Sequence, residues 1–152
     1  MPALLISAFI YTLGEELGWR AYALPCLQEG STALAAGLIA GLLWGLWHVP
    51  TWVAQGYSGT DLVPPVVSVI AGSLLFTWIY NGSGGSLLLV WIFHTASTLT
   101  GYVLLELPTP TEDLVRLATV VGVVLIAGPT DLSRSRPRQR LTAMPMAGVG
   151  GG

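Results

Sequence analysis

The chain has 152 residues, of which 53% are hydrophobic and 9% carry a charge, and its mean hydropathy is +0.69. Because a soluble domain averages about 25% charged residues, this composition excludes an ordinary soluble globule. The net charge is −2, and no basic face exists outside the C-terminal tail, which argues against a nucleic-acid-binding protein. Cys26 is the single cysteine, so no intrachain disulfide can form.

Long uncharged stretches separate the charged residues. They run from Glu29 to Asp61, from Asp61 to Glu106 and from Arg116 to Asp131. Each exceeds or approaches the roughly 20 apolar residues that span a bilayer core. Since backbone polar groups in lipid must be satisfied within the segment, such stretches form helices. We therefore expect an all-α, polytopic transmembrane bundle of about four to five helices.

In chain order, five apolar stretches predict these helices, over residues 1–13, 31–53, 62–80, 86–105 and 114–128. Polar or glycine-rich turn clusters separate the first four, at residues 28–31, 55–61 and 81–85. The first stretch is short for a membrane span and lacks the features of a signal peptide. Either its helix continues through the charged residues that follow, or an N-terminal part of the bundle is absent.

The C-terminal tail differs in composition from the rest. We expect a helical domain over residues 1–130 and a disordered tail over residues 131–152, where arginines alternate with Ser, Pro and Gln and the end is rich in Gly. By the positive-inside rule the tail lies in the cytoplasm. An inert, solvated extension predicts the same orientation.

Ionisable residues inside apolar helices are costly and mark candidate functional sites. Three places qualify, namely Glu15-Glu16 with Arg20, His48, and His94. The i, i+4 spacing of Glu16 and Arg20 predicts an ion pair on one helix face. Glu15 points about 100° away from that pair and is free for acid or base work. A charge cluster at the membrane interface is the alternative for this motif.

Each histidine taken alone fits an interfacial or core residue as well as a functional one. The chain contains two histidines, and both lie in apolar spans, which favours a polar site shared between helices. A carboxylate there could take a proton from water while a neutral histidine orients the water or donates to an oxyanion. Alternatively, Glu15, His48 and His94 could hold a divalent metal whose bound water attacks. No Gly-x-Ser-x-Gly elbow is present to indicate a serine nucleophile.

The three motifs resemble those of the CAAX protease and bacteriocin-processing family (CPBP, or Abi) of intramembrane endopeptidases, which includes the Ras-converting prenyl-protein proteases. Residues 15–20 match Glu-Glu-x-x-x-Arg in full. Residues 44–48 match Phe-x-x-x-His with Trp44 in place of Phe, and residues 94–98 match His-x-x-x-Asn with Thr98 in place of Asn. The likeness is to bacterial members and covers roughly residues 13–101.

This resemblance implies an intramembrane endopeptidase that acts on a peptide or membrane-associated protein substrate in the bacterial plasma membrane. Glu15 would be the catalytic base that activates water. His48 would help to hold that water, and His94 would stabilise the oxyanion. The favoured interpretation requires no cofactor, although the family has been described both as metalloproteases and as glutamate-type proteases. Zinc held by these three residues is therefore the alternative.

The resemblance also implies supporting roles. Glu16 and Arg20 would brace the first helix, and Thr98 would replace the asparagine donor. Because Thr offers one rotatable hydroxyl where Asn offers a donor and an acceptor, Ser97 is an alternative for that role. The family has further helices before the first motif, so we expect this chain to lack N-terminal helices of the full fold.

Two other classes of protein are compatible with the sequence. The first is a non-catalytic membrane protein of the same fold, such as a bacteriocin-immunity or scaffold factor. The second is a small transporter that uses the Glu and His residues as a proton relay, although no internal repeat supports it.

Overall fold

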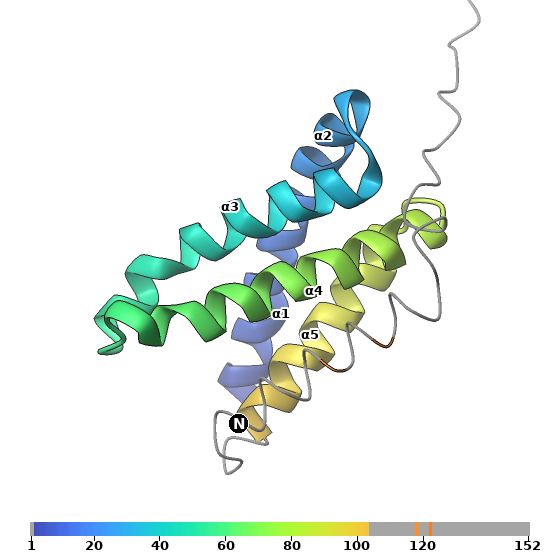
Figure 1. Cartoon of the computed structure of the whole chain (residues 1–152). Helices are drawn as coiled ribbons and strands as arrows, with labels where there is room; N and C mark the ends of the chain where they lie inside the picture. Colours follow the sequence, from blue (N-terminus) through green and yellow to red (C-terminus); the bar gives the residue numbers. More distant parts are fainter. Residues whose placement is uncertain (1, 104–117, 119–121, 123–152) are drawn as a thin grey trace, which may run out of the picture.

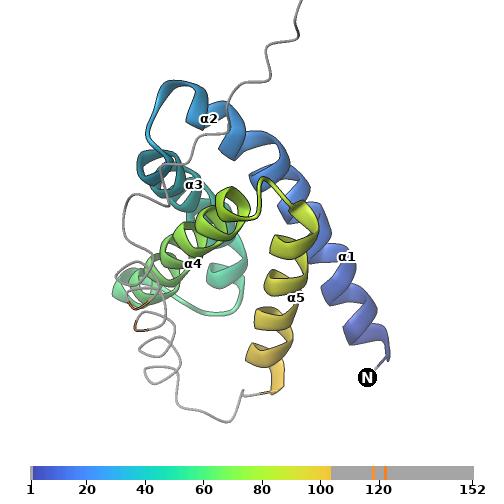
Figure 2. The ribbon, with the colours of Figure 1, turned by 90° about the vertical axis from the view of Figure 1, so that its right-hand side faces the viewer.

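The computed structural model describes residues 2–103, 118 and 122, and this part of the chain contains helices and no strand. The long helices are α1 (Pro2–Gly18), α3 (Ala33–Ala54), α4 (Val63–Gly82) and α5 (Leu87–Val103). Figures 1 and 2 show α3 beside α4 and α1 beside α5. The predicted all-α bundle is confirmed. The fifth predicted stretch, except residues 118 and 122, and the tail from residue 131 lie outside the described residues.

The first predicted helix continues through the charged motif. α1 includes Glu15 and Glu16, and a π-helical turn (Trp19–Ala23) leads from it directly into the short helix α2 (Leu24–Gly30). In this turn the backbone N–H of Leu24 donates to the carbonyl of Trp19, five residues earlier. Such π turns are rare in proteins, but those that do occur inside α-helices often lie at functional sites.

Local sequence explains where the other helices begin. The side chain of Thr32 caps α3 by accepting a 3.2 Å hydrogen bond from the backbone N–H of Ala35. α4 begins with Pro64 in its first turn, where the missing N–H costs nothing. Before α5 the chain turns at Gly84 and Gly85, with φ values of 70° and 87° that favour glycine. The predicted clusters at residues 55–61 and 81–85 accompany the connections before α4 and α5, whereas the one at residues 28–31 is corrected: residues 28–30 form the end of helix α2, which the sequence did not predict.

The bundle is polar at its centre and apolar on its outside. Arg20 and Glu16 are among the largest fully buried side chains, at 1% and 0% exposure. Ile10 and Leu88, in contrast, are 68% and 58% exposed. A polar interior and an apolar exterior are compatible with a bundle surrounded by lipid, because ionisable residues in membrane proteins face the bundle interior. α3, and α4 together with the 3-10 turn before it (Gly59–Leu62), are long and apolar enough to cross a membrane.

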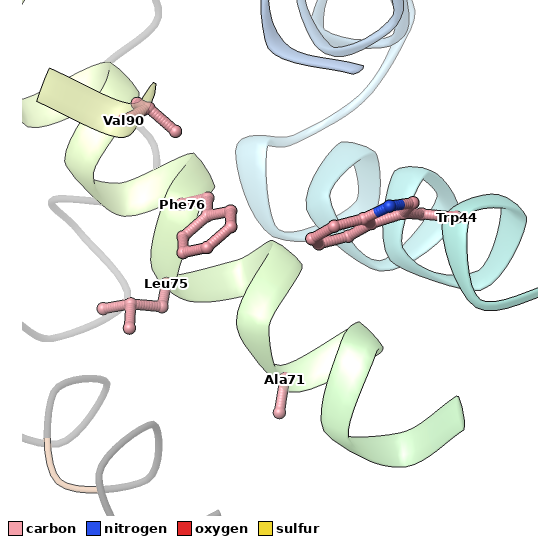
Figure 3. Close-up of a cluster of buried hydrophobic side chains, with 5 residues drawn as sticks. All are labelled: Trp44, Ala71, Leu75, Phe76 and Val90. Atoms are coloured by element: carbon pink, nitrogen blue, oxygen red, sulfur yellow. The ribbon is translucent and has the colours of Figure 1, made fainter. Parts of the chain in front are cut away.

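A small hydrophobic cluster lies next to the polar centre (Figure 3). It joins α3, α4 and α5 and consists of Trp44, Ala71, Leu75, Phe76 and Val90. The rings of Trp44 and Phe76 lie 5.8 Å apart, within the usual range for packed aromatic pairs. The cluster thus supplies a rigid aromatic wall beside the charged residues of α1.

Close contact between α3 and α4 depends on glycines at every fourth position of α3, namely Gly37, Gly41 and Gly45. A Cβ atom added at Gly41 would lie 2.8 Å from the Cβ of Ser73 and 2.9 Å from the Cα of Ile70. The Ser73 hydroxyl also donates a 3.0 Å hydrogen bond to the Gly37 carbonyl across the interface. Small residues at this spacing let membrane helices approach closely.

Gly41→Ala is therefore expected to lower the free energy of unfolding by about 1–3 kcal/mol, because the added methyl group overpacks the α3–α4 interface. Gly72→Ala is the matched control, since a Cβ there meets nothing within 4 Å. It should be neutral or stabilising by about 0.5–1 kcal/mol through reduced backbone freedom. Unfolding in mixed micelles with increasing dodecyl sulfate measures both, and equal stability of the two variants would contradict the close packing.

Candidate active site

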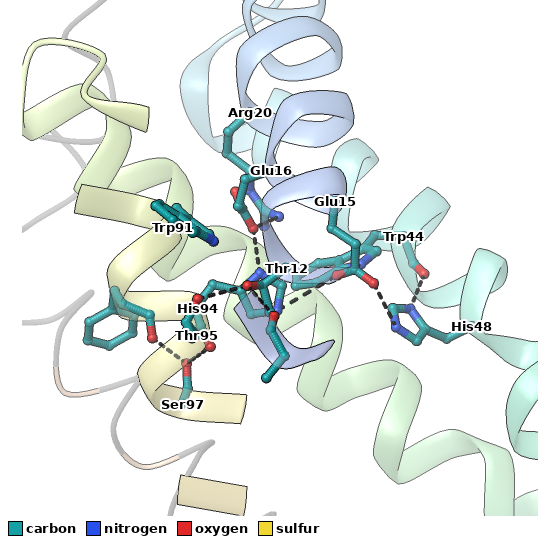
Figure 4. Close-up of polar contacts among 12 residues, drawn as sticks. Thr12, Glu15, Glu16, Arg20, Trp44, His48, Trp91, His94, Thr95 and Ser97 are labelled. Carbon is teal, nitrogen blue, oxygen red and sulfur yellow. Dashed lines mark hydrogen bonds and ion pairs between the residues drawn. The ribbon is translucent and has the colours of Figure 1, made fainter. Parts of the chain in front are cut away.

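The three predicted motifs meet at the centre of the bundle, each contributed by a different helix (Figure 4). Glu15 lies on α1, His48 on α3 and His94 on α5. Nε2 of His48 is 3.6 Å from Oε1 of Glu15, and Nε2 of His94 is 3.7 Å from Oε2 of the same carboxylate. The structure therefore brings together the three residues that the sequence singled out for chemistry.

Glu16 links two other members of the site. NH1 of Arg20 donates to Oε1 of Glu16 at 3.0 Å, which is the predicted i, i+4 ion pair. Nδ1 of His94 lies 2.7 Å from the same oxygen, a contact that sequence reasoning missed. Because a carboxylate oxygen only accepts, Nδ1 of His94 carries the proton and donates it. Glu16 thus orients the His94 ring so that Nε2 faces Glu15.

The orientation of His48 is also determined by its surroundings. Its Nδ1 lies 2.9 Å from the backbone carbonyl oxygen of Trp44. Since a carbonyl only accepts, Nδ1 is the donor, and Nε2 carries the lone pair when the ring is neutral. The ring stacks on Trp52, with centroids 5.3 Å apart, and meets Trp47 edge-on at 5.0 Å. These contacts direct Nε2 toward Glu15.

Arg20 also contacts two aromatic faces. Its guanidinium carbon lies 4.4 Å from the ring centroid of Trp44 and 4.7 Å from that of Phe76, within cation–π range. Nε and NH2 of Arg20 are buried, and neither has a hydrogen-bond partner among the described residues. In addition to its ion pair with Glu16, Arg20 thus connects the π turn to Trp44 of α3 and Phe76 of α4.

The two oxygens of Glu15 have different surroundings. Nε1 of Trp44 donates to Oε2 at 3.2 Å, whereas Oε1 is buried and has no hydrogen-bond partner within the described part of the chain. The side chain of Tyr11 lies beside the same carboxyl group. Sequence reasoning treated Trp44 as a replacement for an aromatic ring and missed its hydrogen bond. The tryptophan itself could have indicated this bond, because a buried indole N–H usually finds a hydrogen-bond acceptor.

Two polar contacts hold α1 against α5 near the site. The hydroxyls of Thr12 and Thr95 lie 2.7 Å apart, and Nε1 of Trp91 donates to the Phe9 carbonyl at 3.1 Å. Thr95 is the neighbour of His94 in the chain. The threonine pair therefore joins α1 and α5 beside the site, a contact that the sequence did not predict.

The two hydroxyls proposed to replace the asparagine, those of Ser97 and Thr98, differ in their hydrogen bonding. Ser97 donates to the carbonyls of Phe93 and His94 in its own helix, at 2.7 and 3.1 Å. Its hydroxyl is therefore already engaged by the backbone. Thr98 is half-buried, and no hydrogen bond of its side chain is present among the described residues. Its assignment as the replacement for asparagine stays a prediction.

The sequence also allowed zinc at Glu15, His48 and His94. No group of three or more His, Cys, Asp or Glu in residues 2–103 or at positions 118 and 122 could hold a metal ion. The Nε2 atoms of His48 and His94 face different oxygens of Glu15. The zinc site stays a prediction.

A helical bundle with a buried carboxylate between two imidazoles is suited to an enzyme that works in an apolar environment. A family model described as "Type II CAAX prenyl endopeptidase Rce1-like" matches residues 1–100. Since this covers more than half of the chain, the chain belongs to this family of integral membrane endopeptidases. The resemblance to the CAAX proteases is thereby confirmed, while membership of the wider CPBP or Abi group stays a prediction.

A relative with a curated description is similar to part of the chain. It is a "CAAX prenyl protease 2" from Methanococcus maripaludis, 40% identical over 50 residues. The matched stretch is 33% of this chain but only 18% of that protein. No solved structure matches the chain.

Proposed function

We propose that this chain is an intramembrane endopeptidase that hydrolyses a peptide bond with a water activated by Glu15. The observation that carries the proposal is the buried carboxylate of Glu15 between the Nε2 atoms of His48 and His94, at 3.6 and 3.7 Å. Membership of a CAAX prenyl endopeptidase family supports the reaction class. For the substrate we propose the C-terminal peptide of a prenylated, membrane-associated protein, the class that the family's description names.

The first chemical step is attack by water. A water that contacts Oε1 of Glu15 and Nε2 of His48 is oriented by both, because Nε2 of neutral His48 accepts a hydrogen bond. We assign the proton to Oε1, because this oxygen lies 3.6 Å from Nε2 of His48 whereas Oε2 accepts the hydrogen bond of Trp44. As the water oxygen forms a bond to the carbonyl carbon, one water proton passes to Oε1. The carbonyl π electrons move onto the substrate oxygen.

His94 would stabilise the resulting oxyanion, and Glu16 defines how. Nδ1–H of His94 is engaged by Glu16, so Nε2 can donate to an oxyanion only when the ring carries both protons. Glu16, which also pairs with Arg20 at 3.0 Å, lies 2.7 Å from Nδ1 and would be the counter-charge of such an imidazolium. We therefore assign the donating role to charged His94, whereas the sequence alone allowed a neutral one.

Collapse of the intermediate completes the hydrolysis. The C–N bond breaks, and the proton held by Glu15 passes to the departing amine nitrogen. The products are a new carboxylic acid and a free amine, with no oxidant, reductant or cofactor consumed. Fixed donors and a positioned base in a water-poor site are the main sources of rate enhancement in such reactions.

The proposal includes a location for the site. The apolar outer surface of the bundle and the apolar length of α3 support a site within the lipid. For the orientation we propose that the arginine-rich tail, which lies outside the described residues, is on the cytoplasmic side of a bacterial plasma membrane, as the positive-inside rule predicts.

Reconstitution tests the proposal directly. The full chain is placed in phosphatidylcholine vesicles with a quenched fluorescent, farnesylated peptide that ends in a Cys-aliphatic-aliphatic-X sequence. We expect cleavage on the carboxyl side of the prenylated cysteine, identified by product mass. Cleavage no faster than in protein-free vesicles would contradict the proposal and would favour a non-catalytic membrane protein of the same fold.

Thr98 provides a narrower prediction for the same assay. If its hydroxyl replaces the asparagine donor, Thr98→Val should lower kcat by about 10-fold or more, because one donor to the oxyanion is lost. Ser97→Ala is the matched control, since its hydroxyl donates to its own helix, and it should leave kcat unchanged. Equal kcat values for the two variants would show that the Thr98 hydroxyl does not take part in the reaction.

A further inference from the structure

The second motif departs from its family pattern at a residue that contacts the catalytic carboxylate. Trp44 is 5% exposed, and its indole Nε1 donates a 3.2 Å hydrogen bond to Oε2 of Glu15 (Figure 4). Phenylalanine, the usual residue at this position of the resembled pattern, has no hydrogen-bond donor. The exchange therefore adds a polar contact at the centre of the site.

We infer that Trp44 is a positioning residue for Glu15, and that its indole N–H holds one carboxylate oxygen so that the other one faces His48. This inference rests on the proposed function, because it specifies how the base of that reaction is oriented.

The asymmetry of the carboxylate supports the inference. Oε2 is bound by the indole, while Oε1 is buried, lacks a hydrogen-bond partner among the described residues, and lies 3.6 Å from Nε2 of His48. A glutamate side chain has several rotatable bonds, so an unrestrained carboxylate would sample many orientations. Fixing one oxygen leaves the other as the proton acceptor, in a constant position.

The other contacts of Trp44 can be distinguished from this hydrogen bond. Its backbone carbonyl accepts from Nδ1 of His48, and its ring face stacks on Arg20 with a 4.4 Å separation. Its ring also meets His94 edge-on, with centroids 5.3 Å apart. A phenylalanine at this position keeps the backbone carbonyl and an aromatic face. Trp44→Phe therefore removes chiefly the indole N–H and part of the ring.

The chain contains a matched control for this substitution. Trp91 also donates an indole hydrogen bond between helices, at 3.1 Å, but its acceptor is the backbone carbonyl of Phe9. Trp91→Phe removes the same kind of donor without changing a contact of the Glu15 carboxylate. Because the indole bond of Trp44 is buried and that of Trp91 is exposed, the kinetics of the two variants are compared together with their melting curves, which report a purely structural loss.

Kinetics of the full chain in vesicles, with the farnesylated peptide as probe, test the role. We expect Trp44→Phe to lower kcat by about 10- to 100-fold with KM unchanged, because a displaced base slows the chemical step more than binding. Trp91→Phe should retain the parent kcat. An unchanged kcat in Trp44→Phe, or an equal loss in Trp91→Phe, would overturn the inference.

A spectroscopic measurement tests the hydrogen bond without relying on activity. In the ¹⁵N-labelled full chain, Glu15→Ala should shift the indole N–H resonance of Trp44 and leave that of Trp91 in place. An unshifted Trp44 resonance would contradict this inference alone. Failure of the parent chain to cleave the peptide, in contrast, would contradict the proposed function.

Discussion

Glu15→Gln is expected to lower kcat for cleavage of the farnesylated peptide by about 10²- to 10⁴-fold, the usual contribution of a general base. The amide keeps the shape of the side chain and can still accept a hydrogen bond from Trp44, but it cannot take a proton from water. The loss should therefore appear in kcat at unchanged thermal stability. Steady-state kinetics in vesicles and a melting curve in detergent measure the two effects.

Glu29→Gln is the control for this substitution. Glu29 is an exposed carboxylate in α2, and no hydrogen bond or ion pair links it to the described site residues. The same chemical change should leave its kcat equal to that of the parent chain. Activity that survives in Glu15→Gln would show that Glu15 is not the base, whatever the fold.

The second large effect concerns stability. Glu16→Leu should lower the free energy of unfolding by about 3–5 kcal/mol, because it leaves the fully buried guanidinium of Arg20 without its ion-pair partner. It also removes the acceptor of His94 Nδ1. Unfolding by dodecyl sulfate titration in mixed micelles gives the difference from the parent chain.

A double variant separates the missing charge from lost packing. Glu16→Leu combined with Arg20→Met replaces the whole ion pair by apolar side chains, which is often neutral or stabilising for buried pairs. The double variant should recover most of the stability that the single variant loses. If it is as unstable as Glu16→Leu alone, the uncompensated charge is not the cause.

Much of the fold could be predicted because it depends on local pattern. Apolar runs bounded by Gly, Pro and polar clusters placed α3, α4 and α5 within a few residues of their observed limits. The Glu16–Arg20 pair follows from helical spacing alone. The predicted convergence of Glu15, His48 and His94 rested on the cost of burying ionisable groups, and the geometry agrees.

Other features depend on how the helices pack, which spacing along the chain does not specify. The contact between Glu16 and His94 joins residues 78 positions apart, and the bond between Trp44 and Glu15 joins residues 29 apart. The glycines of α3 bring α4 close enough for Phe76 to cover Arg20. No periodicity in a single helix reports which partner lies opposite a given face, so these contacts required the structure.

The central claim is that Glu15 and His48 act together on one water. Single-turnover rates of peptide cleavage for Glu15→Gln, His48→Gln and the double variant test it most directly. Residues that act as a unit are strongly non-additive, so we expect the double variant to be no slower than the slower single variant. Losses that multiply in the double variant would show that the two residues act independently and would contradict the claim.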